Sequence, residues 1–369
     1  IGLKRSYFQD LPQVTALQLL ENIVEVERYQ AFFAPPRDDM QGVAAYFSVC
    51  KSNQVSISYK NPDHLLENIR RLYTLTPVLF LLTDNSSGFD EGQRFKGHAG
   101  MRHRRALKDK GGFPPYLFTA KTGEDYINAH INHVFNNPLF VYYNQDGQLI
   151  RLPSGTWESF QSLKAKGLNT ATNYNFAQSI LWPDVKIAAL KSAQDEVTGH
   201  RYEARMFGVG LHQHISALLI VAGLAFNPVF AEKTDQLLKT FGFDWNDTTA
   251  THTNITNAYN NALNHGDNFL EIPYGHLQAI DFTKQFADLI EENYAGTSLE
   301  KYTSAITSIA RTGLTDAKVN RILFPNLEDA IDFQRYFDPE IFAHTHQSAH
   351  MAFANDLKKH TISTIRSHI

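Results

Sequence analysis

The alternation of polar and apolar side chains over residues 54–59 is the clearest strand pattern in the chain. Successive side chains of a β-strand point to opposite faces of the sheet, so the segment predicts a strand with one apolar and one polar face. The apolar positions are Val55, Ile57 and Tyr59, and the polar positions are Gln54, Ser56 and Ser58.

A helix is predicted directly after this strand. Asn61 is a favourable N-cap and Pro62 suits the first helical position, where its missing N–H costs nothing. An apolar stripe with helical spacing follows, formed by Leu65, Leu66, Ile69 and Leu72. We expect the helix to end before Pro77, with a short apolar run over 78–82 leading into a turn at 83–88.

The remaining pattern predicts strands first and helices afterwards. Short strands are expected at 116–119, 139–143 and 202–207, and helices at 277–293 and 299–309. The apolar run over 215–226 is shorter than the ~20 residues that span a bilayer, and predicts a buried helix. The fold class is therefore α+β with a mostly antiparallel sheet, strand-rich over 40–210 and helical over 211–369. Because no long linker separates these parts, we expect one compact unit over 1–369.

Composition and charge narrow the function classes. Hydrophobic residues make up 43% of the chain and charged residues 20%, as in ordinary globular proteins. With 34 Lys and Arg against 38 Asp and Glu, the formal charge of −4 argues against nucleic acid or a membrane surface as partner. The single cysteine, Cys50, excludes an internal disulfide and is interpreted as a core residue. No signal segment is recognisable, and we expect a cytosolic protein with small-molecule substrates.

The segment 202–208 holds the most suggestive charged pair. On a strand, Glu203 and Arg205 share one face about 6.6 Å apart, which lets the carboxylate hold a cation while the guanidinium binds an anionic group. A cross-strand ion pair on a solvated face is the alternative that spacing alone favours. The basic run 102–105 suits an anionic ligand such as a triphosphate, although such runs are usually solvated surface.

The 16 histidines raise the question of a metal site. His212 and His214 could chelate from one face of a strand, and His344, His346 and His350 include a pair spaced for one face of a helix. Neither group has the neighbouring glutamate that a metalloprotease motif requires. Solvated or hydrogen-bonded histidines are therefore the default interpretation.

Several short stretches follow one another in an order that is typical of one enzyme family. They are Gln54–Tyr59, Leu81–Gly92, Met101–His103, Phe113–Phe118, Pro138–Tyr142, Trp182–Lys186, Tyr202–Arg205 and Ala310–Thr315. In order, and over roughly residues 28–320, they resemble motifs of the glutamate–cysteine ligases of the plant and proteobacterial branch. Examples are that family's Tyr-Leu-Glu-x-Arg and Val-Arg-Thr-Gly-Val-Thr segments. The order of the pieces carries the resemblance, because no single piece is specific.

The resemblance implies a glutamine-synthetase-like fold with a cleft and an ATP-dependent carboxylate–amine ligase of glutathione biosynthesis. In that reaction the γ-carboxylate of glutamate is phosphorylated, and the amine of cysteine attacks the acyl phosphate. ATP and Mg²⁺ would be the cofactors, because both the phosphoryl group and glutamate are anionic. A different acceptor amine is an open alternative.

Residue roles come with the same resemblance. Glu203 and Arg205 would be catalytic, and Glu203 would also be a metal ligand. The residues that would bind the amino-acid substrate or line its cleft are Arg102, Gln54, Asn85 and Ser86, and those that would bind ATP are Arg104 and Lys110.

Two acidic motifs of the family do not occur in the printed sequence. They are the metal-binding Gly-x-Glu-x-Glu strand and the Glu-Pro-Gly-Gln-x-Glu-x-Ser segment, both of which would precede Ile1. We expect either that an N-terminal portion of about a hundred residues precedes Ile1 or that the chain is a divergent member. Such a member would have an altered substrate, or would bind and regulate without catalysis.

Overall fold

The structure of the 369-residue chain is a computed structural model. It describes residues 52–85, 89–90, 93–94, 96–98, 100–101, 110–139, 141–152, 158–191, 197–208, 210–315, 317–319, 352, 355–360 and 363. These residues cluster into two compact units, whereas the sequence suggested one. The first unit takes its described residues from Lys51–Arg102 and Asp184–Ile369, and the second from His103–Pro183.

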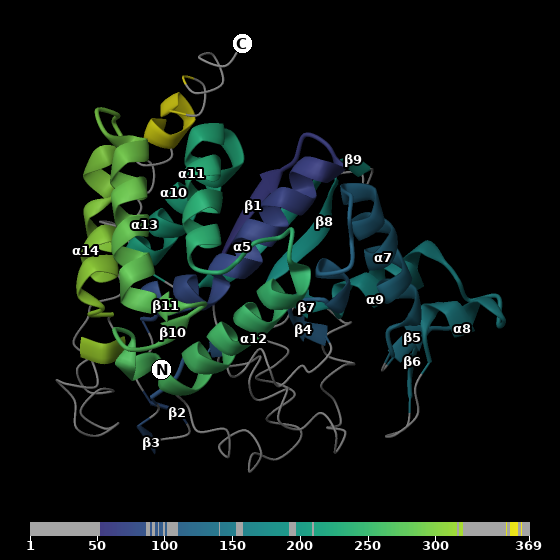
Figure 1. The fold of residues 1–369 in the computed structure, drawn as a ribbon. Coiled ribbons are helices and arrows are strands. Elements are labelled where there is room, and N and C mark those ends of the chain that lie inside the picture. Colours follow the sequence, from purple (N-terminus) through teal and green to yellow (C-terminus); the bar gives the residue numbers. More distant parts are fainter. Residues whose placement is uncertain are drawn as a thin grey trace, which may run out of the picture. The chain divides into compact units, whose positions relative to one another are not determined.

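The main sheet belongs to the first unit. The long strand β9 (Val197–Phe207) pairs antiparallel with β1 (Asn53–Ser58) and with β8 (Val185–Lys191). Figure 1 shows these strands side by side. The predicted strands 54–59 and 202–207 are confirmed, although β9 begins five residues earlier, at Val197. Alternate residues of the sheet are fully buried, namely Val55, Tyr202, Ala204 and Val185. The sheet therefore has one core face and one polar face.

Helix α5 (Pro62–Leu82) starts as predicted, with the Asn61 side chain accepting a hydrogen bond from the backbone N–H of His64 at 2.8 Å. The predicted end before Pro77 is wrong, because α5 continues through the proline to Leu82. A proline inside a helix costs ~3 kcal/mol. Every residue from Leu72 to Leu82 is buried, and each large apolar side chain buried contributes roughly 1.5–3 kcal/mol. Packing thus outweighs the local cost.

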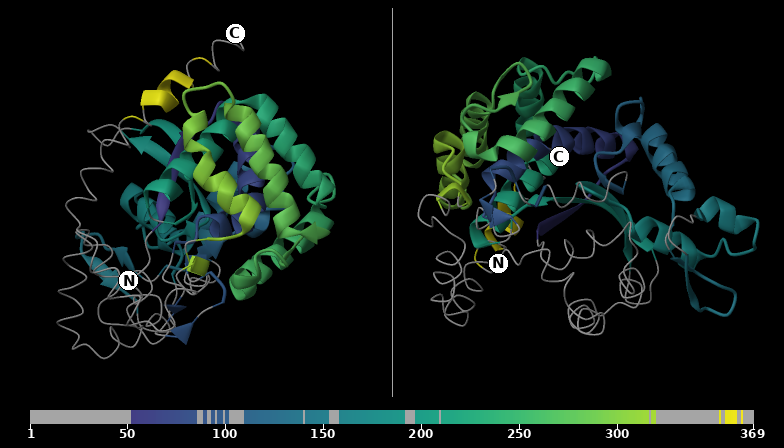
Figure 2. Two further views of the ribbon diagram at one scale, coloured as in Figure 1. Left: turned by 90° about the vertical axis from the view of Figure 1, so that its left-hand side faces the viewer. Right: turned by 90° about the horizontal axis from the view of Figure 1, so that it is seen from below.

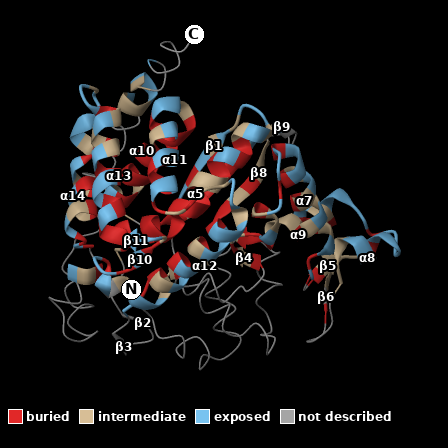
Figure 3. Ribbon diagram, in the orientation of Figure 1, coloured by how far each residue is buried: buried red, intermediate tan, exposed pale blue. Residues whose placement is uncertain are grey.

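Helices dominate the rest of the first unit, as expected. They are α10 (Leu211–Phe226), α11 (Pro228–Thr240), α12 (Thr248–His265), α13 (Ala279–Tyr294) and α14 (Ser304–Thr312). Helices α5 and α10 pack against the sheet, and α13 packs between α11 and α14, as Figures 1 and 2 show. Their inward faces are buried and their outward faces exposed (Figure 3). The apolar run 215–226 is the buried part of α10, as predicted.

Short elements complete this unit. They are the hairpins β2 (Phe89–Asp90) with β3 (Gln93–Arg94) and β10 (Pro273–Tyr274) with β11 (Leu277–Gln278), and the 3-10 turns η3 (Gly266–Asn268) and η4 (Glu300–Tyr302). Gly275, in the turn of the second hairpin, has φ +67°, and a Cβ there would lie 1.8 Å from the carbonyl oxygen of Phe241. Only glycine fits this turn. Beside it, the buried Tyr274 hydroxyl donates to the Thr74 carbonyl of α5 at 2.8 Å.

No described helix is by itself both long enough and apolar enough to cross a bilayer. Helices α10 and α11 meet that measure only when they are taken together, and the chain bends by 101° between them.

The second unit is built around a core of its own. Its helices are α7 (Gly123–Asn136), α8 (Phe160–Lys164) and α9 (Ala171–Ser179). Its strands pair as β5 (Val141–Tyr143) with β6 (Leu149–Arg151), antiparallel, and β4 (Gly111–Gly112) with β7 (Trp182–Pro183), parallel. The core includes Val134, Leu139, Leu163 and Phe176. This separate core explains why the chain divides into two units.

Two of the sequence predictions fall in the second unit. The strand predicted at 116–119 is wrong, because the segment forms the 3-10 turn η2 (Pro115–Leu117) after Pro114. Pro114 and Pro115 remove two backbone donors and fix φ at values that suit a turn. The strand predicted at 139–143 is confirmed only for Val141–Tyr143, while Leu139 forms an isolated bridge with Glu158. Taken together, the described residues form an α+β protein.

Candidate functional site

The polar face of the main sheet gathers charged side chains in one place. Arg201, Glu203 and Arg205 lie on one face of β9, because they occupy alternate positions of the strand. The antiparallel registers place Ser56 of β1 and Lys186 of β8 directly opposite Glu203, one on each side. One carboxylate thus lies among three cationic side chains, which leaves this group of four with a net charge of +2.

Both carboxylate oxygens of Glu203 accept hydrogen bonds from guanidinium groups. Nη2 of Arg205 donates to Oε2 at 2.5 Å and Nε donates to the same oxygen at 3.2 Å. Nη2 of Arg201 donates to Oε1 at 2.7 Å. The Glu203 residue is 6% exposed, so its charge is held by these partners and little by water. The arrangement is therefore a buried carboxylate clamp formed along the single strand β9, not the solvated cross-strand ion pair that spacing alone favoured.

The clamp sets the protonation state of Glu203. Burial alone would raise its pKa, but the charge and hydrogen bonds of Arg205, followed by the charges of Arg201 and Lys186, outweigh burial and hold the pKa below its ordinary value. Glu203 is therefore ionised at neutral pH. The guanidinium and ammonium groups beside it belong to the side-chain types that bind carboxylate and phosphate groups.

The described residues do not by themselves provide a magnesium site. No group of three or more His, Cys, Asp or Glu side chains among them could hold a metal ion. Mg²⁺ needs oxygen ligands with free lone pairs in octahedral geometry, whereas both Glu203 oxygens already face guanidinium groups. The role of Glu203 as a metal ligand stays a prediction.

Of the residues predicted to line the substrate cleft or bind ATP, Gln54 and Asn85 lie on or beside the main sheet. Gln54 lies on the same face of β1 as Ser56, beside an irregularity in the β1–β9 pairing, and is exposed. Asn85 follows α5 and packs close to the chain just after β9, where a Cβ on Gly208 would lie 2.7 Å from its Oδ1. Arg102, Arg104 and Ser86 lie outside the described residues.

Lys110, predicted to bind ATP, belongs to the second unit. It is buried, and its ammonium group donates to the side-chain oxygen of Asn137 and, at 2.6 Å, to the carbonyl of Pro138. These contacts join the residue just before β4 to the end of α7.

The histidine hypotheses are also resolved in part. His212 and His214 lie in the first turn of α10, not on a strand. Residues two apart on a helix point in different directions, and the strand on which the chelate alternative depended does not exist for this pair. His344, His346, His350 and Cys50 lie outside the described residues.

The sequence analysis missed two members of the clamp. Arg201 extends the alternation of Glu203 and Arg205 by one more step, so the pattern of β9 could have revealed it. Lys186 is 17 positions before Glu203 in the chain, and it lies opposite Glu203 only because of the register in which β8 pairs with β9. No local signal could have placed it there.

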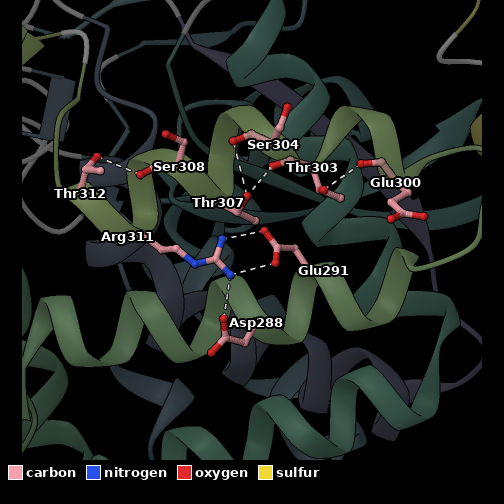
Figure 4. A network of polar contacts seen from close by, with 9 residues as sticks. All are labelled: Asp288, Glu291, Glu300, Thr303, Ser304, Thr307, Ser308, Arg311 and Thr312. Carbon is pink, nitrogen blue, oxygen red and sulfur yellow. Dashed lines mark hydrogen bonds and ion pairs between the residues drawn. The ribbon is translucent and has the colours of Figure 1, made fainter.

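A second charged network joins α13 to α14 (Figure 4). The guanidinium of Arg311 donates to both carboxylate oxygens of Glu291, at 2.6 and 2.8 Å, and to Asp288 at 2.7 Å. On α14, the Thr307 hydroxyl donates to the backbone carbonyl of Thr303 at 3.2 Å. These groups satisfy one another, so the network stabilises a helix pair and is a poor candidate for ligand binding.

Comparison of the sequence with family models and with curated proteins gives no match.

Proposed function

We propose that the polar face of the β1–β9–β8 sheet binds a small anionic substrate, and that the chain is an ATP-dependent carboxylate–amine ligase of the glutamate–cysteine ligase kind, acting in the cytosol. The observation that carries the proposal is the buried Glu203, clamped by Arg201 and Arg205 with Lys186 opposite. The clamp coincides with the motif Tyr202–Arg205, which is one of the ordered stretches that resemble the family.

The sheet supports this proposal by its two unequal faces. The resemblance implies a mostly antiparallel sheet with a cleft, and anionic substrates in such a cleft would require polar side chains on one face of the sheet. Helices α5 and α10 contact the main sheet, and the clamp residues alternate along β9 with the apolar core residues Tyr202 and Ala204. The strand with the clearest polar face, β1, lies next to the clamp strand.

The proposed chemistry requires positive charge at one place. A γ-carboxylate oxygen of glutamate attacks the γ-phosphorus of ATP, the bond to the bridging oxygen breaks, and ADP leaves. The acceptor amine then attacks the acyl carbon, loses a proton, and displaces phosphate to give the γ-glutamyl amide. Guanidinium groups stabilise the negative charge that collects on the transferring phosphoryl group. Mg²⁺ bound with ATP would neutralise its phosphates, and we assign no residue to that role.

A binding protein without catalysis is the second candidate. It is favoured by one observation, that both oxygens of Glu203 are engaged by guanidinium groups and none of the described carboxylates joins it as a metal ligand. Such a protein would bind glutamate or nucleotide on the same face without turnover.

The decisive experiment measures ADP release by the full chain with ATP, Mg²⁺, glutamate and a panel of amines that includes cysteine. The proposal predicts that ADP release depends on glutamate and on one amine. It also predicts that Glu203→Gln lowers the rate of ADP release. The matched control is Glu291→Gln, which removes a carboxylate from a guanidinium away from the sheet. Binding of glutamate or ATP by calorimetry without any ADP release would establish the second candidate instead. Absence of both binding and release would refute the proposal.

A further inference from the structure

We infer that Arg201 is the guanidinium that binds the anionic group of the ligand, whereas Arg205 is a positioning residue that holds Glu203. The inference rests on the proposed function and specifies which cation does what. It departs from the sequence analysis, which gave Arg205 a catalytic role and did not single out Arg201.

Arg205 is committed to the protein. Its side chain is 11% exposed, and it donates twice to the same oxygen of Glu203, through Nε and Nη2. Its backbone N–H donates to the carbonyl of Asp184 at 2.9 Å, so main chain and side chain are both held. A guanidinium held in this way orients the carboxylate and has little freedom to meet a ligand.

Arg201 is less buried than Arg205 and makes fewer hydrogen bonds to the protein. Its side chain is 34% exposed, and among the described residues it makes one hydrogen bond, from Nη2 to Oε1 of Glu203. Its Nε is buried and has no partner within the same set. An arginine has five N–H donors, and a buried donor without an acceptor destabilises the folded protein. A ligand oxygen that reached this donor would remove that destabilisation.

The free donors of Arg201 define the chemistry of the ligand. Several N–H groups of one planar guanidinium match a group with two or more oxygens, that is a carboxylate or a phosphate. Lys186 adds a further positive charge near Glu203. Glutamate and ATP both carry such groups, so the two sources share one recognition chemistry and must be separated by titration.

The test is a double-mutant analysis of ligand affinity by calorimetry, with glutamate and with Mg·ATP titrated separately. Arg201→Gln and Arg205→Gln are each made in the natural chain and in the Glu203→Gln background. A ligand-binding residue keeps its effect when Glu203 is changed, whereas a residue that acts through Glu203 loses it. Arg311→Gln is the control, because it removes the same charge from an exposed network on α14.

We expect Arg201→Gln to weaken binding of one of the two ligands at least tenfold in both backgrounds, with Arg201→Lys recovering part of the loss. Arg205→Gln should weaken binding in the natural chain and change it less than twofold once Glu203 is Gln. The inference would be overturned if the effect of Arg205→Gln persisted in the Glu203→Gln background while that of Arg201→Gln disappeared. Unchanged affinity in Arg201→Gln would also overturn it. Neither result would refute the proposed function. If the natural chain binds neither ligand, the proposed function itself fails. If the double variants do not fold, the comparison of Arg201→Lys with Arg205→Lys in the natural chain decides. The inference then requires that Arg201→Lys weakens ligand binding without lowering the midpoint of thermal unfolding, and that Arg205→Lys does not show this combination.

Discussion

Replacing Glu203 by glutamine tests the clamp most directly. The two side chains have nearly the same shape, so the change removes a charge and exchanges one acceptor oxygen for a donor. The amide oxygen can still accept from Arg205, but its NH₂ then faces Arg201, which is also a donor. Arg201 is 34% exposed and can turn to water, whereas Arg205 is 11% exposed and cannot. The loss in the free energy of unfolding therefore comes mainly from the contacts between residue 203 and Arg205.

The expected size of the effect follows from these contacts. A hydrogen bond to a charged group contributes about 1.5–3 kcal/mol and a neutral one about 0.5–1.5 kcal/mol. In Glu203→Gln the two Arg205 bonds lose the charge of their acceptor while the guanidinium keeps its own, so each becomes weaker, and the Arg201 contact is discounted because it is partly solvated. We expect a loss of about 2–3 kcal/mol in the free energy of unfolding. For a unit of this size, that loss corresponds to a fall of about 5–10 °C in the midpoint of thermal unfolding.

The assay compares thermal unfolding of the natural chain, Glu203→Gln and Glu291→Gln at neutral pH. Glu291 also contacts an arginine twice, but both partners are well exposed, so its loss should cost less than about 1 kcal/mol. Equal midpoints for the natural chain and Glu203→Gln would refute the buried clamp. So would an equal loss in the two variants.

The same comparison has a definite pH dependence. The pKa of Glu203 in the folded protein lies below the ordinary value of 4.5. A carboxyl group with a lowered folded pKa stabilises the protein fully above its unfolded pKa and loses that contribution as the pH falls through the folded pKa. The stability difference between the natural chain and Glu203→Gln should therefore be constant near neutral pH and shrink below about pH 4.5. A difference that grew on acidification would contradict the assigned charge state.

Three further predictions concern the fold. Gly275→Ala should cost ~3 kcal/mol more in urea unfolding than Gly296→Ala, because both positions have positive φ but only the first meets a carbonyl oxygen; equal costs would contradict the turn geometry. Tyr274→Phe should lose about 1 kcal/mol, since a buried hydroxyl bond to α5 disappears, and an unchanged midpoint would show that the bond is absent. In the second unit, Asn173→Ala should lose about 3 kcal/mol, because its fully buried amide makes three hydrogen bonds to the main chain. Unchanged amide-exchange protection around β5 in that variant would oppose this placement.

Local signals explain which elements the sequence could predict. The alternation at 54–59 and the Asn61–Pro62 cap depend on neighbouring residues only, and both occur where expected. The end of α5 depended on packing with distant segments, which carried the helix through Pro77. The strand predicted at 116–119 is wrong for the opposite reason, because Pro114 and Pro115 just before it favour a turn more strongly than its apolar side chains favour a strand.

The candidate site shows the same division. The sequence alone determined that Glu203 and Arg205 share one face of a strand, since the two-residue period of a strand is a property of the backbone. Only the tertiary structure decided that this face is a buried clamp with Lys186 opposite the carboxylate, because strand register joins residues that are distant in the chain. The different roles inferred for Arg201 and Arg205 likewise follow from how deeply each side chain is buried. Burial depends on the whole fold, and no local pattern of residues contains it.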